Sequence, residues 1–385
     1  MKKGLICAAL ALALCLPARA AEVEIPAPSA VLMDAATGTV LYEKNAHERL
    51  APASVTKVMT LLLVMEALED GTIGWDDTVI ASEHAAGKGG SQVYLEPGEG
   101  MSMDEMLKSV TVSSANDCAA ALAEHVAGSE AAFVERMNAR AQELGMNDTH
   151  FVNCTGLDDD PEAREHRSSA WDIAIMSREL LKHDAIRNYT TIWMDTVRNG
   201  QFGLSNTNKL VRFYKGATGL KTGYTSGAGH CLSASAERDG MELIAAVMHC
   251  ASSAERFSSA KALLDYGFAN YALAEPEADP SPVQVRLGAA AAVIPVPASD
   301  TPLLVSKAQR AVVRQETEVL PQIDAPVEAG QQLGELRVYA GDEQLAAIPM
   351  VAPESVRRLS IWEIALRLLD GVCFGAWERA AEAVT

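Results

Sequence analysis

The spacing of apolar residues first predicts a pair of strands and a buried helix. Residues 30–33 and 39–43 read as two short strands joined by an Ala-Ala-Thr-Gly turn. Residues 54–70 predict a helix that is apolar on almost every side and ends at Gly71. A helix without a polar face is a buried helix.

Further along, the pattern changes from helical to β-prone. A polar, glycine-rich stretch at 82–100 predicts surface loops. Helical spacing then covers residues 103–110, 116–126 and 130–144. Short β-prone runs follow at residues 219–225, 230–236 and 242–248, before a last helix at 256–271. Strands at both ends with helices between them predict an α+β unit, in which one antiparallel sheet is closed by its first and last segments.

The remaining sequence predicts two smaller parts. Residues 275–282 are polar and proline-rich, as in a stiff linker. Residues 283–351 contain short Val, Leu and Ile runs separated by Gly and Pro, which predicts a small all-β domain. From residue 352 to 385 the chain predicts an amphipathic helix with an apolar stripe, made of Leu359, Trp362, Leu366, Leu369, Cys373 and Trp377. Such a helix lies in a membrane surface or packs on its own domain or a partner.

The first twenty residues have the pattern of a secretory signal peptide. Lys2 and Lys3 precede an apolar run from Leu5 to Leu16, which ends at Ala18-Arg19-Ala20. The run is too short to favour a retained membrane helix, and a lipid anchor at Cys15 is a minor alternative. We therefore expect residues 21–385 to be exported, to the outer face of the cytoplasmic membrane, the periplasm or the cell wall.

Composition excludes several classes of protein. The 385 residues are 49% hydrophobic and 22% charged, as in globular domains. A net charge of −19 disfavours nucleic acid as a partner. Five cysteines remain after the leader, which is odd and sparse, so no disulfide framework is expected. The histidines and cysteines show neither an H-E-x-x-H nor a Cys-x-x-Cys pattern, so no metal site is predicted.

Candidate chemistry begins with Ser54 and Lys57. Three positions apart on a helix, they share a face, and the first turn of a helix favours negative charge that develops on a nucleophile. Ser54 could equally be an ordinary helix cap, and Lys57 could extend to solvent. A lysine buried near a second cation has a lowered pKa, and as a free amine it accepts the serine proton. A second S-x-x-K, Ser258 to Lys261, lies on an ordinary amphipathic helix and is a surface feature.

Two further segments complete the pattern. Ser114 and Asn116 precede a helix, where they either cap it or point into a cleft. There, Ser114 would relay a proton to the leaving amine and Asn116 would orient Lys57 or the substrate amide. Lys221-Thr222-Gly223 falls on a strand, where Gly223 would let a substrate backbone approach and the Tyr224 amide would join that of Ser54 in an oxyanion hole. If this strand is an edge, it can accept an extended peptide.

These motifs, in this order, resemble the serine penicillin-recognising enzymes. Several other segments, such as Met33-Asp34-Ala35-Ala36-Thr37-Gly38 and Asn206-Thr207-Asn208-Lys209-Leu210, are similar to the low-molecular-mass D-alanyl-D-alanine carboxypeptidases. The resemblance covers nearly the whole mature chain. It implies a β-lactamase-like catalytic domain at 21–274 with an antiparallel sheet flanked by helices, the small β domain at 275–351, and a terminal helix at 352–385 as a membrane anchor.

The same resemblance implies a function. Ser54 would form an acyl-enzyme with peptidoglycan stem peptides ending in D-Ala-D-Ala and release the terminal D-Ala, without a metal or organic cofactor. Lys221 and Thr222 would hold the substrate carboxylate. Arg256 is a further carboxylate candidate, although it could also be a surface arginine at a helix start. The loop at 158–166 lacks the Glu-Pro-x-x-Asn pattern of class A β-lactamases, so we expect penicillin to form a long-lived adduct. A β-lactamase and a non-catalytic wall-binding scaffold are the alternatives, and added endopeptidase or transpeptidase activity stays open.

Overall fold

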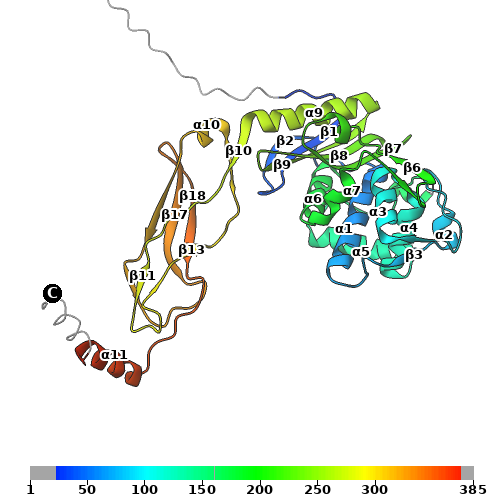
Figure 1. The fold of residues 1–385 in the computed structure, drawn as a ribbon. Coiled ribbons are helices and arrows are strands. Elements are labelled where there is room, and N and C mark those ends of the chain that lie inside the picture. Colours follow the sequence, from blue (N-terminus) through cyan, green and yellow to red (C-terminus); the bar gives the residue numbers. More distant parts are fainter. Residues whose placement is uncertain (1–22, 160, 374–385) are drawn as a thin grey trace, which may run out of the picture.

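The computed structural model describes residues 23–159 and 161–373, and side chains as far as residue 369. Figure 1 shows a mixed α and β domain, an elongated β-rich domain beside it and a helix at the far end of the latter. The predicted α+β architecture with a small all-β domain is confirmed. The predicted signal peptide lies outside the described residues, as does Trp377 of the predicted terminal stripe.

A five-stranded antiparallel sheet organises the first domain. Its strands lie in the order β2 (Val40–Lys44), β1 (Ser29–Asp34), β9 (Met241–Cys250), β8 (Gly229–Arg238) and β7 (Ala217–Thr225). The first strand of the chain pairs with the last of the sheet, since Ala30 lies opposite Val247. This pairing closes the domain, as the sequence predicts, and leaves β7 at an edge.

Helices cover both faces of this sheet. On one face lies α9 (Ser253–Asn270), which buries Leu263, Leu264 and Phe268 against it. The other face carries a helical layer, whose longer members are α1 (Lys57–Glu69), α3 (Met103–Val112), α4 (Asn116–Ala127), α5 (Glu130–Glu143) and α6 (Ala170–Leu181). Shorter elements connect them: η1 (Ala53–Thr56), α2 (Glu83–Ala86), η2 (Pro161–Glu165), η3 (Asp184–Ile186), α7 (Arg187–Thr190), α8 (Leu210–Phe213) and the strand pairs β3 (Thr78–Ile80) with β4 (Gly100–Ser102) and β5 (Met194–Val197) with β6 (Phe202–Ser205).

Helix α1 occupies the interior of the helical layer. Eleven of its residues are buried, from Lys57 to Leu68, as its unbroken apolar pattern predicts. The helix starts later than the sequence suggests, because residues 53–56 form the 3₁₀ turn η1. The polar stretch at 82–100 also differs from the prediction: it contains α2 and buries Val93 and Leu95 in the core.

The second domain is built almost wholly from strands. A two-stranded sheet joins β10 (Tyr271–Ala274) to β14 (Leu303–Ser306). A three-stranded sheet follows, with its strands in the order β12 (Ala292–Val293), β11 (Val283–Arg286) and β16 (Gln322–Asp324). A four-stranded sheet has the order β13 (Val296–Pro297), β18 (Glu343–Val351), β17 (Gln332–Ala340) and β15 (Val313–Val319). Residues 311–312 form a turn after α10 (Lys307–Arg310), and β15 starts at Val313. The domain limits given above stay predictions.

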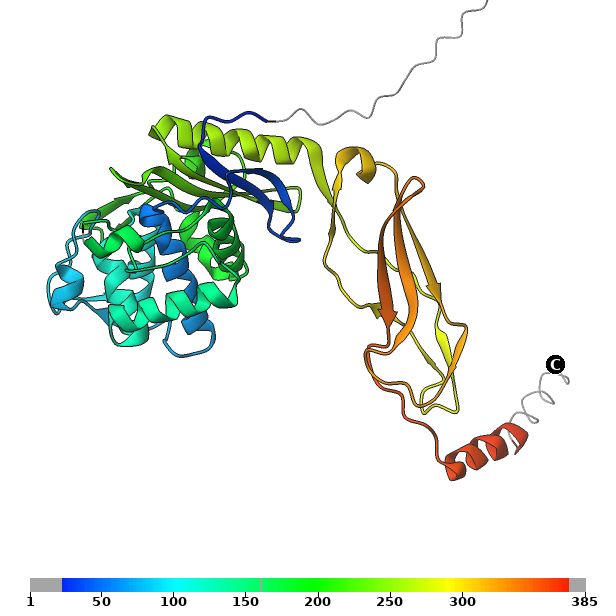
Figure 2. The ribbon, with the colours of Figure 1, turned by 180° about the vertical axis from the view of Figure 1, so that it is seen from behind.

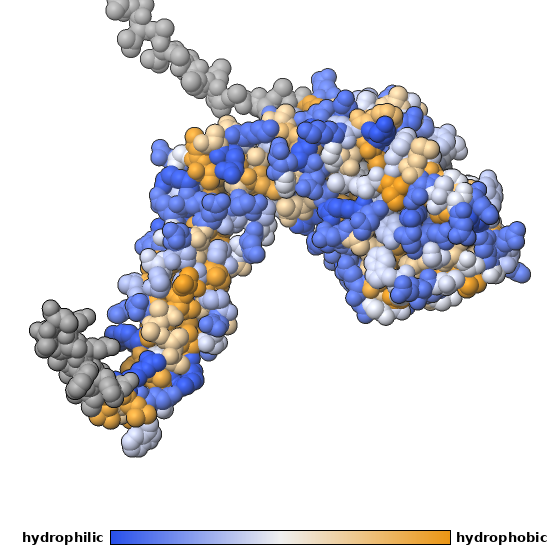
Figure 3. Space-filling view, in the orientation of Figure 1, coloured by the Kyte–Doolittle hydropathy of each residue, from blue (hydrophilic) through white to orange (hydrophobic). Residues whose placement is uncertain are grey.

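Helix α11 (Ile361–Cys373) follows the β-rich domain. Its apolar side chains are unusually exposed: Trp362 by 81%, Leu366 by 65% and Leu369 by 59%. Figure 3 shows the hydrophobic surface that results at this end of the molecule. Within the described residues, no helix has the length and apolar character needed to cross a membrane.

Candidate active site

The turn that carries Ser54 is held between two close backbone segments. Ala53 has φ +47°, an uncommon conformation for a residue with a side chain. A Cβ on Gly223 would lie 2.6 Å from the Pro52 carbonyl oxygen and 3.1 Å from the Ser54 nitrogen. On another side, Gly156 has φ +80°, and a Cβ there would lie 1.9 Å from the Ala53 carbonyl oxygen. Gly223 therefore leaves room for the turn at residues 52–56, which we call the nucleophile turn because it carries the predicted nucleophile Ser54.

Lys57 is fully buried, with its amine against the Ser54 hydroxyl. Lys57 Nζ lies 2.9 Å from Ser54 Oγ and donates a second hydrogen bond of 2.9 Å to the Thr155 carbonyl oxygen. Burial lowers the pKa of Lys57 from 10.5 to about 7, against opposing effects of Cys154 and Asp117. A large share of this amine is therefore unprotonated near neutral pH and can take the hydroxyl proton. Extension of Lys57 to solvent is excluded, and the Ser54 side chain caps no helix.

Lys221 supplies a second buried amine on β7. Its pKa is held well below the ordinary value, first by burial and then by the nearby charges of Lys57 and Arg256. The sequence suggests that a second cation helps to lower the pKa of Lys57. In the structure, burial is the main cause for Lys57, and the effect of the neighbouring cation falls on Lys221.

Ser114 and Asn116 lie at the junction of α3 and α4. Ser114 is buried and has φ +65°, an uncommon conformation for a residue with a side chain. Asn116 begins α4, and its Nδ2 donates to the Gly89 carbonyl oxygen at 2.7 Å. Its Oδ1 is buried without a hydrogen-bond partner among the described residues. That oxygen is free to accept a hydrogen bond from a substrate amide or from Lys57.

Strand β7 forms one wall beside these groups. Thr222 Oγ1 donates to Thr207 Oγ1 at 2.6 Å, and Tyr224 is 60% exposed with its ring stacked on His230. Arg256 is buried, not a surface residue, and its Nη1 donates to the Gly223 carbonyl oxygen at 2.9 Å. Arg256 thus braces the strand that faces the nucleophile turn. Ser258 and Lys261, the second S-x-x-K, are both exposed on α9.

Several residues of the site were not singled out from the sequence. Thr155 contributes a backbone carbonyl, and backbone groups leave no residue-type signal. Gly156 has a weak signal, because Asn153 and a glycine three residues later are typical of a turn, and Asn153 Oδ1 does accept from the Gly156 nitrogen. Thr207 belongs to the segment 206–210, which the sequence analysis used only for its similarity to the low-molecular-mass carboxypeptidases and to which it gave no role in the site.

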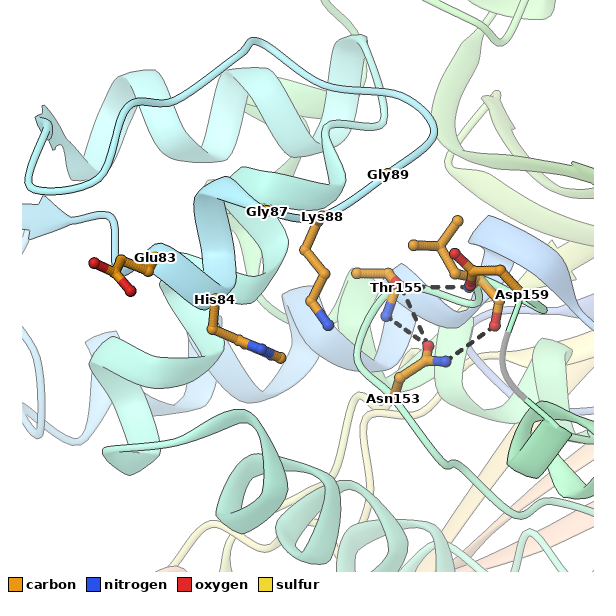
Figure 4. A pocket seen from close by; sticks show the side chains of 9 residues that line it. Glu83, His84, Gly87, Lys88, Gly89, Asn153, Thr155 and Asp159 are labelled. Atoms are coloured by element: carbon orange, nitrogen blue, oxygen red, sulfur yellow. Dashed lines mark hydrogen bonds between the residues drawn. The ribbon is translucent and has the colours of Figure 1, made fainter.

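A cavity of about 330 Å³ opens beside these groups. Figure 4 shows His84 and Lys88 on one side of it and Asn153, Thr155 and Asp159 on the other. Its wall shares Thr155 and Gly89 with the contacts made by Lys57 and Asn116. The cavity therefore adjoins the backbone groups that hold Lys57 and Asn116.

A hydroxyl beside a buried amine at the edge of an antiparallel sheet is the arrangement of enzymes that transfer acyl groups through serine. Comparison with known proteins identifies the family. Residues 17–252 match the family model described as D-alanyl-D-alanine carboxypeptidase, and residues 268–358 match the C-terminal domain of penicillin-binding protein 5. The chain belongs to the D-alanyl-D-alanine carboxypeptidase family and is a serine-type enzyme of this activity.

Individual relatives agree with this assignment. The chain is 42% identical over 347 residues to D-alanyl-D-alanine carboxypeptidase DacF of Bacillus subtilis, covering 88% of each protein. It is 32% identical to DacC of Escherichia coli, covering 93% of each. Penicillin-binding protein 5 of Haemophilus influenzae superposes with a TM-score of 0.75 at 30% identity, over 88% of this chain and 99% of that one. Penicillin-binding protein D2 of Listeria monocytogenes, solved with ampicillin bound, superposes with a TM-score of 0.58 at 30% identity, over 64% of this chain and 99% of that one.

Proposed function

We propose that Ser54 removes the terminal D-Ala from peptidoglycan stem peptides through an acyl-enzyme. Lys57 Nζ takes the hydroxyl proton as Ser54 Oγ attacks the carbonyl of the penultimate D-Ala. The bond to the terminal D-Ala nitrogen breaks, and a proton relayed through Ser114 leaves with this amine. Water then cleaves the ester, which restores Ser54 and frees the shortened peptide.

The other residues hold the substrate in this scheme. The amides of Ser54 and Tyr224 bind the oxyanion, which the closeness of β7 to the nucleophile turn supports. Lys221 and Thr222 bind the terminal carboxylate. Asn116 Oδ1 accepts a hydrogen bond from the substrate amide. Arg256 acts mainly as a brace for β7, since its Nη1 is engaged by the backbone of Gly223 and Cys231.

The observation that carries this proposal is the contact between Lys57 and Ser54. A lysine with no exposed surface, a pKa near 7 and an amine 2.9 Å from a serine hydroxyl has the properties of a general base.

The test compares the wild type with Ser54→Ala on a D-Ala-D-Ala peptide and on labelled penicillin. We expect the wild type to release D-Ala and to carry a covalent label, and the variant to do neither. Ser258→Ala, in the exposed S-x-x-K, is the matched control and should behave as the wild type. Rapid turnover of intact penicillin without a lasting adduct would favour a β-lactamase, and neither product nor adduct would favour a scaffold.

The structure also supports a long-lived penicillin adduct. Glu162 and Glu165, the glutamates of the 158–166 loop, are exposed, and so are Asp158 and Asp159. Among the described residues of this loop, the buried polar one is His166, whose Nδ1 accepts from the Val152 nitrogen and whose Nε2 contacts Thr56 Oγ1 at 2.7 Å. Burial lowers the pKa of His166 to about 3. With Nδ1 occupied as an acceptor and Nε2 bearing the hydrogen, this neutral ring has no lone pair left to activate water.

We further propose that the exported protein attaches to the outer face of the membrane through α11. The helix is tied to the β-rich domain, because Arg367 donates to the carbonyl oxygens of Gly288 and Ala289, and Arg357 pairs with Glu363. Its exposed Trp362, Leu366 and Leu369 lie along one stripe. A helix of this kind inserts its apolar side chains into the interface between headgroups and acyl chains.

Sedimentation with phospholipid vesicles tests the attachment. The wild type is expected to sediment with vesicles, and Trp362→Ser/Leu366→Ser/Leu369→Ser is expected to stay in solution. Ile294→Ser/Val312→Ser/Leu320→Ser removes exposed apolar side chains of the β-rich domain instead and serves as the control. Equal sedimentation of both triple variants would contradict the role of α11.

A further inference from the structure

Glu130, a buried carboxylate outside the motifs, connects the cavity of Figure 4 to the base Lys57. It is the first residue of α5 and its side chain is 10% exposed. Both of its oxygens are occupied. Oε1 accepts from the backbone nitrogen and from Sγ of Cys154, each at 3.1 Å. Oε2 accepts from Lys88 Nζ and from His84 Nε2, each at 2.6 Å.

This carboxylate stays ionised in the folded protein. Burial alone would raise its pKa, but the hydrogen bonds from Lys88, His84 and Cys154 outweigh burial and lower the pKa to about 2. These donors hold the Glu130 carboxylate in one position, since moving any of them away would leave its buried negative charge less compensated.

The segment that Glu130 holds is the one that positions Lys57. Cys154 is followed directly by Thr155, whose carbonyl oxygen accepts from Lys57 Nζ. On its other side, the Cys154 carbonyl oxygen accepts from Thr60 Oγ1 of α1 at 2.6 Å. Gly156, which follows Thr155, packs closely against the carbonyl of Ala53, the residue before Ser54. Three consecutive residues therefore join Glu130 to the base, to its helix and to the nucleophile turn.

We infer that Glu130 is a positioning residue for the reaction: it fixes the Cys154–Gly156 segment, so that the Thr155 carbonyl holds Lys57 Nζ against Ser54 Oγ. The inference rests on the proposed role of Lys57. The Thr155 carbonyl occupies one hydrogen of the Lys57 amine, which leaves the nitrogen lone pair to face the Ser54 hydroxyl. Without Glu130, the Cys154 nitrogen loses its acceptor and the segment can shift, so the amine loses its second anchor.

His84 and Lys88 reach Glu130 from the cavity side. Figure 4 shows both side chains directed toward the cavity from the region of α2. Both pair with Glu130 Oε2. Their contribution passes through Glu130, which makes Glu130 the residue to change.

The experiment compares Glu130→Ala with Glu242→Ala. Glu242 is an equally buried carboxylate of the same domain, at the start of β9, with partners Arg187 and Thr218. Single-turnover acylation by labelled penicillin separates the affinity of the first complex from the rate of acylation. We expect Glu130→Ala to acylate about tenfold to a hundredfold more slowly with unchanged affinity, and Glu242→Ala to acylate at the wild-type rate.

Melting temperatures of both variants accompany the kinetics, so that loss of stability is measured separately. Glu130→Gln keeps an oxygen that can accept from the Cys154 nitrogen and is expected to recover most of the acylation rate, which also covers the case in which Glu130→Ala does not fold. Equal acylation rates for the wild type and Glu130→Ala would overturn the inference, as would a fall in affinity instead of rate. If Ser54→Ala still released D-Ala, the proposed function itself would fail, whatever the behaviour of Glu130.

Discussion

Replacing Gly223 by alanine tests whether the close packing of β7 against the nucleophile turn determines the position of Ser54. The added Cβ would lie 2.6 Å from the Pro52 carbonyl oxygen and 3.1 Å from both Ala53 Cβ and the Ser54 nitrogen. Nonbonded heavy atoms pack best near ~3.5 Å, so the turn or the strand has to move by roughly 1 Å. The strand resists this movement, because the Gly223 carbonyl oxygen is held by Arg256. The turn that carries Ser54 is therefore the part expected to shift.

Such a shift has a large effect on rate and a moderate effect on stability. A misplacement of about 1 Å in a catalytic group costs on the order of a hundredfold in rate. Forcing one extra methyl group into a packed site costs about 1–3 kcal/mol. Each kcal/mol lowers the melting temperature of a domain of this size by about 2–4 °C. We expect Gly223→Ala to remain folded and to acylate about a hundredfold more slowly.

The assay measures acylation by labelled penicillin, release of D-Ala from peptide and thermal unfolding. Gly203→Ala is the matched control, since Gly203 lies on strand β6 with open space where its Cβ would be placed. This control is expected to retain the wild-type acylation rate. If Gly223→Ala acylated within about threefold of the wild type, the reasoning from close packing would be refuted.

Two further predictions concern pH. Acylation of Ser54 is expected to slow about tenfold for each pH unit below about 7, because only the unprotonated Lys57 accepts the hydroxyl proton and its pKa is about 7; a flat rate profile between about pH 5.5 and 8 would contradict the role of Lys57. Stability should also fall in acid through His166, whose pKa is lowered from 6.5 in the unfolded chain to about 3 in the folded protein. The unfolded chain binds a proton there that the folded protein does not, so this stability is present above pH 6.5 and is lost toward pH 3, by up to about 1.4 kcal/mol per pH unit. Urea unfolding of the wild type and His166→Gln checks this, and equal slopes against pH would exclude His166 as the cause.

The sequence predicted the parts of the site that depend on spacing and order. Ser54 and Lys57 share a face because of helical periodicity, and the apolar surroundings of Lys57 predicted its burial. The β-prone pattern placed Lys221 on a strand, and pairing of the first and last strands left that strand at an edge. The α+β fold followed from the same alternation of elements.

The parts that could not be predicted depend on groups without a residue-type signal. The acceptor for Lys57 is a backbone carbonyl, 98 positions away in the chain. Burial as the main cause of the lowered pKa of Lys57 requires knowledge of the packed interior, and so does the position of Arg256 behind β7. Gly223 was recognisable as a site of close approach, but only the structure shows that the approaching backbone is the protein's own.

The burial of Lys57 and Lys221 side by side has a consequence for engineering. Two amines that water would solvate are kept in the interior, where apolar side chains of similar size would fit with less electrostatic cost. Selection for heat resistance alone would therefore tend to replace these lysines, which are the proposed base and the proposed ligand of the substrate carboxylate, so thermostable variants are better sought at positions remote from both.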